Sequence, residues 1–194
     1  MAGMKNRDLL PVGAKPAPDE LAFVQGYANL LRFIQMRREI DGVAVLKKWL
    51  VRHGLLAAAG RVDQQDLRLA LSFHDALRGL IRANEGTQVE ASNVRRLNRL
   101  VGRFNLAVVF APDGSARLEP LARGVEKALG RLLAVVIQAM ADGSWRRLKA
   151  CGNPDCQWVY YDSSKNNSGR WCSMLVCGGR AKARTYRQRR ASRQ

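Results

Sequence analysis

The chain contains no cysteine before residue 151 and no acidic residue after Asp162. It also lacks a long hydrophobic run. The longest, Leu132–Ala141, contains Gln138 and is much shorter than the roughly 20 residues that a membrane-spanning helix needs. The apolar stretch Leu9–Ala14 is short and contains a proline, so we expect no secretory signal. These absences predict a protein without membrane association, located in the cytoplasm.

Motifs of the common catalytic sites are missing as well. The chain has no HExxH motif, no Gly-rich phosphate loop and no arrangement typical of a Ser-His-Asp triad. Of the two histidines, His53 falls in the last turn of an expected helix, where a cation suits the helix dipole. His74 lies at the edge of an apolar helix face and is expected to be structural. We therefore expect no enzymatic activity.

Positive charge is abundant and unevenly distributed. The formal net charge is +17, and the pI is about 10.8. From residue 145 onward, twelve Lys and Arg residues stand against two acids, whereas residues 1–144 carry twenty-one against fourteen. The C-terminal quarter therefore contributes +10 of the +17. Such a surplus favours binding to a polyanion, nucleic acid before an acidic membrane or protein.

Hydrophobic periodicity predicts a helical N-terminal domain over residues 19–143, after a flexible lead-in at residues 1–18 that contains three prolines. We expect Asp19 and Asp41 to cap the first two helices, Asp63 and Asp66 to form a capping box, and Gly54 to end the second helix. The expected helices cover residues 19–38, 41–54, 63–81, 94–101 and 121–140.

A β-hairpin is expected between the last two of these helices. Two segments, Phe104–Phe110 and Arg117–Glu119, flank the turn sequence Pro112-Asp113-Gly114. The predicted fold class is therefore mainly α: a helical domain with a small hairpin, followed by a small C-terminal module over residues 144–194.

That module contains all four cysteines, in two C-x4-C pairs separated by fifteen residues: Cys151, Cys156, Cys172 and Cys177. In a reducing cytosol, clustered cysteines indicate metal ligands before disulfides. Four thiolates suit one tetrahedral Zn²⁺ that stabilises a small module, and they leave no open position for catalysis. We expect Arg170 and Arg180, which flank the second pair, to offset the negative charge of the site.

The module ends in a basic segment that is expected to form a helix from Arg180. We predict that it binds nucleic acid through cations spread around much of the helix, because guanidinium groups pair bidentately with phosphates and base edges. A solvated tail is the alternative. RNA is a possible partner if the aromatic residues at 158, 160 and 161 stack on bases, although we expect them in the module's core. The predicted nucleic-acid contacts are Arg170, Arg180, Lys182, Arg184, Arg187, Arg189 and Arg190.

The module resembles the CGNR zinc finger. The resemblance rests on the two cysteine pairs, on Trp158-Val-Tyr-Tyr-Asp162 and on the run from Arg170 through Arg184. Gly179 stands where the name motif of that family has Asn, so a hydrogen bond made by the Asn would be lost.

Upstream, Leu21-Ala-Phe-Val24, Leu46–Leu50 and Ala70–Arg78 are similar to the ABATE domain that usually precedes this finger. There Gln25-Gly26 replaces an Asn-Thr pair, and His74 stands where an Arg is expected. The two resemblances together imply a stress-induced transcription regulator with a DNA-binding finger. The helical domain would sense a small-molecule effector or form a homodimer.

Overall fold

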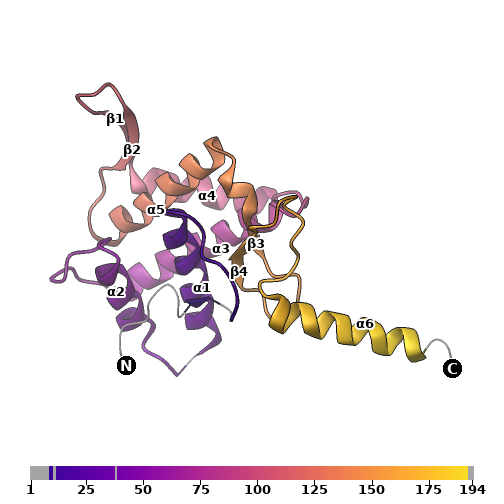
Figure 1. Ribbon diagram of the computed structural model, residues 1–194. Helices are drawn as coiled ribbons and strands as arrows, with labels where there is room; N and C mark the ends of the chain where they lie inside the picture. Colours follow the sequence, from indigo (N-terminus) through magenta and orange to yellow (C-terminus); the bar gives the residue numbers. More distant parts are fainter. Residues whose placement is uncertain (1–8, 11, 38, 192–194) are drawn as a thin grey trace.

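A computed structural model describes residues 9–10, 12–37 and 39–191, and its main elements are helices, two short hairpins and a C-terminal helix (Figure 1). The expected fold class is confirmed. In chain order the elements are α1 (Leu21–Met36), α2 (Gly42–Arg52), α3 (Gln64–Ala83), α4 (Ala91–Phe104), β1 (Leu106–Phe110), β2 (Ala116–Pro120), α5 (Gly124–Ala141), a 3₁₀ turn (Ser144–Arg147), β3 (Leu148–Ala150), β4 (Val159–Tyr161), a π-helical turn (Met174–Gly178) and α6 (Gly179–Ala191).

Helix starts follow the capping residues at two of the three expected positions. The side chain of Asp41 accepts a hydrogen bond from the Ala44 amide, and Asp63 forms a capping box with Asp66. The prediction of Asp19 as a cap was wrong. Its backbone adopts a positive φ of 46°, and Glu20 occupies the cap position without a side-chain hydrogen bond. Helix α1 ends at Met36, and the predicted last residue, 38, lies outside the described residues.

The expected β-hairpin is confirmed, with β1 and β2 antiparallel and Val108 opposite Leu118. Gly114 has a φ of 82° in its turn, a conformation that glycine adopts without strain. The hairpin projects from the helical body on the side away from α6 (Figure 1). Helix α4 is longer than expected. Helix α5 begins three residues later than the expected start at 121, and Leu121 and Met140, the first and last residues of the expected helix, are both exposed.

The hydrophobic core is centred on α1, which packs against α3 and α5. Tyr27 is fully buried and donates a 2.6 Å hydrogen bond to the Ala70 carbonyl of α3. Phe73 of α3 meets Phe104 of α4 edge-to-face, with ring centroids 5.3 Å apart. Aromatic residues from three helices therefore occupy the centre of the body.

The β3–β4 hairpin belongs to the same core. Trp145, Leu148 and Val159 are buried in one cluster with the residues of α1, α3 and α5. Asn29 of α1 is fully buried: its amide donates to the Val159 carbonyl at 2.9 Å, and its oxygen accepts from the Val159 amide at 2.8 Å. The segment that leads into the cysteines is therefore anchored on the central helix.

We expected a flexible lead-in over residues 1–18, of which residues 1–8 and 11 lie outside the described residues. Within the described part, Leu9 and Ala17 are buried. Their backbone groups pair with polar side chains of α1: Asn29 donates to the Leu9 carbonyl, and the Ala17 amide donates to Gln25. None of the helices in the described ranges combines the length and apolar character required to cross a membrane.

Candidate metal centre and nucleic-acid interface

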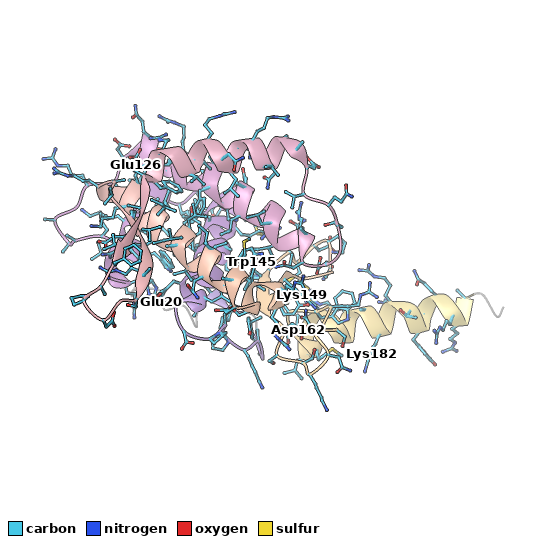
Figure 2. The ribbon with its side chains drawn as sticks, turned by 90° about the horizontal axis from the view of Figure 1, so that it is seen from above. Glu20, Glu126, Trp145, Lys149, Asp162 and Lys182 are labelled. Atoms are coloured by element: carbon cyan, nitrogen blue, oxygen red, sulfur yellow. The ribbon has the colours of Figure 1, made fainter. Side chains whose placement is uncertain are left out.

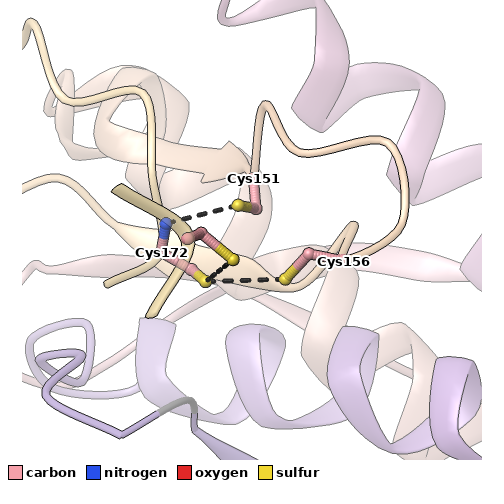
Figure 3. Close-up of side chains that lie close together, drawn as sticks. Cys151, Cys156 and Cys172 are labelled. Carbon is pink, nitrogen blue, oxygen red and sulfur yellow. Dashed lines mark hydrogen bonds between the residues drawn. The ribbon is translucent and has the colours of Figure 1, made fainter. Parts of the chain in front are cut away.

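The four cysteines converge although they are far apart in sequence. Their sulfur atoms all lie within 4.8 Å of one another. The Sγ atom of Cys172 is 3.6 Å from that of Cys156 and 3.8 Å from that of Cys177, and its backbone amide donates to the Cys151 sulfur at 3.5 Å (Figure 3).

The first pair is formed by a tight loop that follows β3. The Asn153 carbonyl accepts hydrogen bonds from the Cys156 and Gln157 amides, which turns the chain back on itself. Gly152 lies against the backbone of the second pair and donates a 2.9 Å hydrogen bond to the Arg170 carbonyl. A Cβ at Gly152 would lie only 3.1 Å from that carbonyl oxygen, so the close approach favours glycine.

The second pair spans a π-helical turn that continues directly into α6. Cys172 precedes the turn and Cys177 lies within it. At Gly178 an added Cβ would meet the Met174 sulfur at 2.6 Å, so the exposed Met174 side chain would have to move to admit a larger residue. The helix α6 therefore starts immediately after the last cysteine, with its first turn fixed by the cysteine cluster.

The sulfur atoms cannot all carry a negative charge on their own. Hydrogen bonds from Cys156 and Cys172 lower the pKa of Cys151 to about 2. The contact with Cys151 in turn raises the pKa of Cys156 to about 12, and contacts with Cys151 and Cys156 raise that of Cys172. One thiolate thus forms at the expense of its neighbours, and a cation is required for all four to deprotonate together.

The arrangement fits Zn²⁺. With Zn–S distances of about 2.3 Å, a tetrahedral site places its sulfur atoms about 3.8 Å apart. The sulfur–sulfur distances of 3.6 and 3.8 Å around Cys172 match this value. The cofactor is one structural Zn²⁺, for which Cys151, Cys156, Cys172 and Cys177 are the predicted ligands.

Comparison with known families agrees with this geometry. The model of the CGNR zinc finger matches residues 147–190, and the ABATE model, described as "Putative stress-induced transcription regulator", matches residues 28–143, more than half of the chain. The protein belongs to the ABATE family. No curated protein matches the chain significantly. The ABATE match covers the helical body from the middle of α1 to the end of α5, and the finger match covers the cysteine cluster and nearly all of α6.

The side chain that donates a hydrogen bond to a cysteine sulfur is not one of those expected from the sequence. Arg170 and Arg180, expected to offset the charge, are exposed, and the Arg170 guanidinium lies 5.7 Å from the centre of the Trp171 ring. The side-chain amide of Asn153 instead donates to the Cys177 sulfur at 3.7 Å. Asn153 could be read from the sequence only as a turn residue between two cysteines, because its hydrogen-bond partner is distant in the chain.

A buried ion pair closes the loop between the two cysteine pairs. Lys149 donates to Asp162 at 2.7 Å and to the Asn167 carbonyl at 2.6 Å, and both members of the ion pair are almost fully buried (Figure 2). Asp162 also accepts from the amides of Ser164 and Gly169. The pair therefore organises residues 163–169, which connect β4 to the second cysteine pair.

The predicted basic helix is confirmed as α6, which extends away from the body and has no buried residue (Figures 1 and 2). Its cations at positions 180, 182, 184, 187, 189 and 190 are all exposed or half-exposed, with no acid in the helix. Tyr160 is buried, and Trp158 and Tyr161 pack against the core, as expected for structural aromatics. The roles of Arg170 and of the α6 cations in binding nucleic acid stay predictions.

The two histidines have different environments. His74 is fully buried, with Nε2 3.1 Å from the Ala28 carbonyl, which agrees with the expected structural role. The expected cationic role of His53 was wrong. Burial, and then the charge of Arg52, lower its pKa, and its ring packs 4.6 Å from Trp49 and 5.4 Å from Phe23. A neutral imidazole in an aromatic cluster contributes packing rather than charge at the end of α2.

Proposed function

We propose that the protein is a zinc-dependent DNA-binding regulator in which α6 is the principal DNA contact. The observation that carries this proposal is an exposed helix with six cations and no acid that starts two residues after Cys177, the last predicted zinc ligand. The zinc finger and the hairpin fastened to α1 hold the first turn of this helix, so its position relative to the body is defined. Such a helix can enter a groove without unfolding any other part of the protein.

The dimensions and charge distribution of α6 suit the major groove. Thirteen helical residues extend about 20 Å, and a helix with side chains fits a groove about 12 Å wide. At 100° per residue, Arg180, Arg184 and Arg187 lie on one side, and Lys182 and Arg189 on the opposite side. Cations on opposite sides of one helix can reach the phosphates of both groove walls, whereas a flat protein surface would leave half of them unpaired.

RNA binding is the alternative function, and the aromatic residues weigh against it. Single-stranded RNA is bound largely by stacking on exposed aromatic rings. Tyr160 is buried and donates to the Gly169 carbonyl at 2.6 Å, and Trp158 packs between the two cores. On α6, Tyr186 is exposed and remains the residue through which stacking could occur.

We infer that the helical body senses a ligand or forms a homodimer. For the zinc finger we infer binding rather than catalysis. Four cysteine ligands complete the tetrahedral coordination of zinc, which leaves no position for a substrate. A cytoplasmic location remains our prediction, because zinc ligation requires reduced thiols.

The test is a salt titration of duplex DNA binding by the zinc-loaded protein, with single-stranded RNA as competitor. If all six α6 cations contact phosphates, the log–log slope is about −5.4. The double variant Arg184→Gln/Arg187→Gln should lower the slope by about 1.8, whereas Arg95→Gln/Arg99→Gln, which removes the same charge from exposed positions on α4, should leave it nearly unchanged. A slope that is equal in both double variants contradicts the assignment of α6, and preferred binding of RNA selects the alternative.

A further inference from the structure

A polar cavity of about 510 Å³ lies between α3, the loop that follows it and α4, and none of the cysteines lines it. This volume is within the range of small-molecule sites. Three guanidinium groups line it, from Arg78 and Arg82 of α3 and Arg96 of α4, together with the amide side chain of Asn93. Asp75 and Glu90 contribute two carboxylates, so the lining carries a net positive charge.

Arg78 has hydrogen-bonding capacity that the protein does not use. It is only 8% exposed, and its Nη2 donates to the Gln157 carbonyl at 2.9 Å. Its Nη1 is buried and has no hydrogen-bond partner among the residues described, and the same holds for Nε of Arg32. Burial, followed by the charges of Arg82 and Arg32, lowers the pKa of Arg78 to about 10. A buried donor of this kind costs free energy unless an acceptor arrives.

The two carboxylates of the lining, Asp75 and Glu90, do not provide the acceptor that Nη1 of Arg78 lacks. Asp75 lies 3.2 Å from Nδ1 of His74, accepts from Gln35 at 3.2 Å and is 3.8 Å from Arg96. Glu90 accepts from the Ser92 hydroxyl at 3.3 Å. Both acids therefore have other partners, while Nη1 of Arg78 has no hydrogen-bond acceptor among the described residues.

We propose that this cavity binds a small organic oxyanion, a phosphate or carboxylate group held by Arg78, Arg82 and Arg96. Guanidinium groups pair bidentately with both kinds of group, and the volume leaves room for an organic part beside the neutral side chains of the lining. This inference deepens the sensing role in the proposed function, but it depends on residues that are separate from α6.

The position of Arg78 also connects the cavity to the zinc finger. Gln157, whose carbonyl accepts from Arg78, directly follows Cys156 and has a positive φ of 53°. One guanidinium would thus bind the oxyanion through one nitrogen and the finger's first loop through the other. An oxyanion that orders Arg78 is placed to stabilise this loop.

The experiment is calorimetric titration of the zinc-loaded full-length protein with inorganic phosphate and, separately, with succinate, at constant ionic strength set by chloride. We expect saturable 1:1 binding of at least one of them, and which one binds identifies the oxyanion. Arg82→Gln and Arg96→Gln should each weaken binding about ten-fold or more, because each removes a charged hydrogen-bond donor. Arg78 is not substituted, because it also supports the finger.

Two control variants make the result decisive. Arg99→Gln removes the same charge from an exposed position on α4 outside the cavity and should bind as the unsubstituted protein does. Arg184→Gln/Arg187→Gln in α6 should also leave oxyanion binding unchanged, whatever it does to DNA binding. Absence of saturable binding of both probes overturns the site. So does equal weakening by Arg99→Gln, or weakening only by the α6 variant, which would assign the oxyanion to the basic helix.

Discussion

Replacement of Asn29 by alanine should destabilise the helical body and the zinc finger together. Asn29 is fully buried in α1 and joins three segments: its amide donates to the Leu9 and Val159 carbonyls at 3.0 and 2.9 Å, and its oxygen accepts from the Val159 amide at 2.8 Å. The substitution removes all three hydrogen bonds and leaves the buried Val159 amide without its acceptor.

The magnitude follows from these contacts. An unsatisfied buried amide costs about 1–3 kcal/mol, and each of the two other lost hydrogen bonds costs about 1 kcal/mol. The sum, about 3–5 kcal/mol, is a large part of the roughly 5–15 kcal/mol that stabilises a typical domain. With a urea m-value of about 2 kcal/mol/M, the unfolding midpoint should fall by about 2 M.

The assay is urea unfolding of the zinc-loaded protein, followed by helical circular dichroism and by zinc release to a chromogenic chelator. Because β4 is packed in the same core as α1, both signals should shift to lower urea by the same amount. Asn98→Ala, at an exposed position on α4, is the matched control and should shift neither. If zinc release moves to lower urea while the helical signal stays in place, the finger unfolds independently and the reasoning is refuted.

Three further substitutions test the finger itself. Cys172→Ser should reduce zinc from about one ion per chain to nearly none by elemental analysis, whereas Ser173→Ala should retain it, since the Ser173 hydroxyl has no hydrogen-bond partner within the described residues. Burial would raise the pKa of Asp162, but hydrogen bonds from Lys149 and the following loop outweigh it and lower the pKa to about 2. Because the unfolded pKa is about 3.9, the lowered pKa of Asp162 stabilises the fold by about 2–3 kcal/mol above pH ~4, and this stabilisation is lost as the pH falls towards ~2. The difference in unfolding free energy between the unsubstituted protein and Asp162→Asn should therefore shrink between pH ~4 and ~2. A difference that stays constant over this range contradicts the assignment. Gly179→Asn should keep zinc and raise the unfolding free energy by about 0.3–0.5 kcal/mol. The reason is that Gly179 has helical φ and ψ of −60° and −45°, and an added Cβ would meet only the Met174 carbonyl oxygen, at 3.5 Å. Loss of zinc in this variant would show that glycine is required.

Local signals in the sequence predicted much of the fold. Asp41, Asp63 and Asp66 cap helices because their side chains reach amides only two or three residues away. The turn at Gly114 was likewise predicted from adjacent residues, Pro112-Asp113-Gly114. The cysteine pairs predicted a zinc site, because two short loops with soft ligands favour one tetrahedral ion whatever the rest of the chain does.

Contacts between distant residues could not be predicted in the same way. A buried Asn, such as Asn29, carries no sign of its partners, which lie 20 and 130 positions away. The role of Arg78 was hidden for the same reason, since its partner Gln157 is 79 residues distant. Asp19 failed as a cap because the preceding segment, fastened at Ala17 by Gln25, places it in a left-handed conformation instead.

These distant contacts give the zinc finger a defined place on the body. The β3–β4 hairpin is buried against α1 and α3, the Lys149–Asp162 pair fixes the loop to the second cysteine pair, and the π-helical turn continues into α6. Arg78 adds a contact from α3, because its guanidinium donates to the Gln157 carbonyl of the first cysteine loop. The finger from which α6 extends is therefore attached to both α1 and α3 through buried contacts.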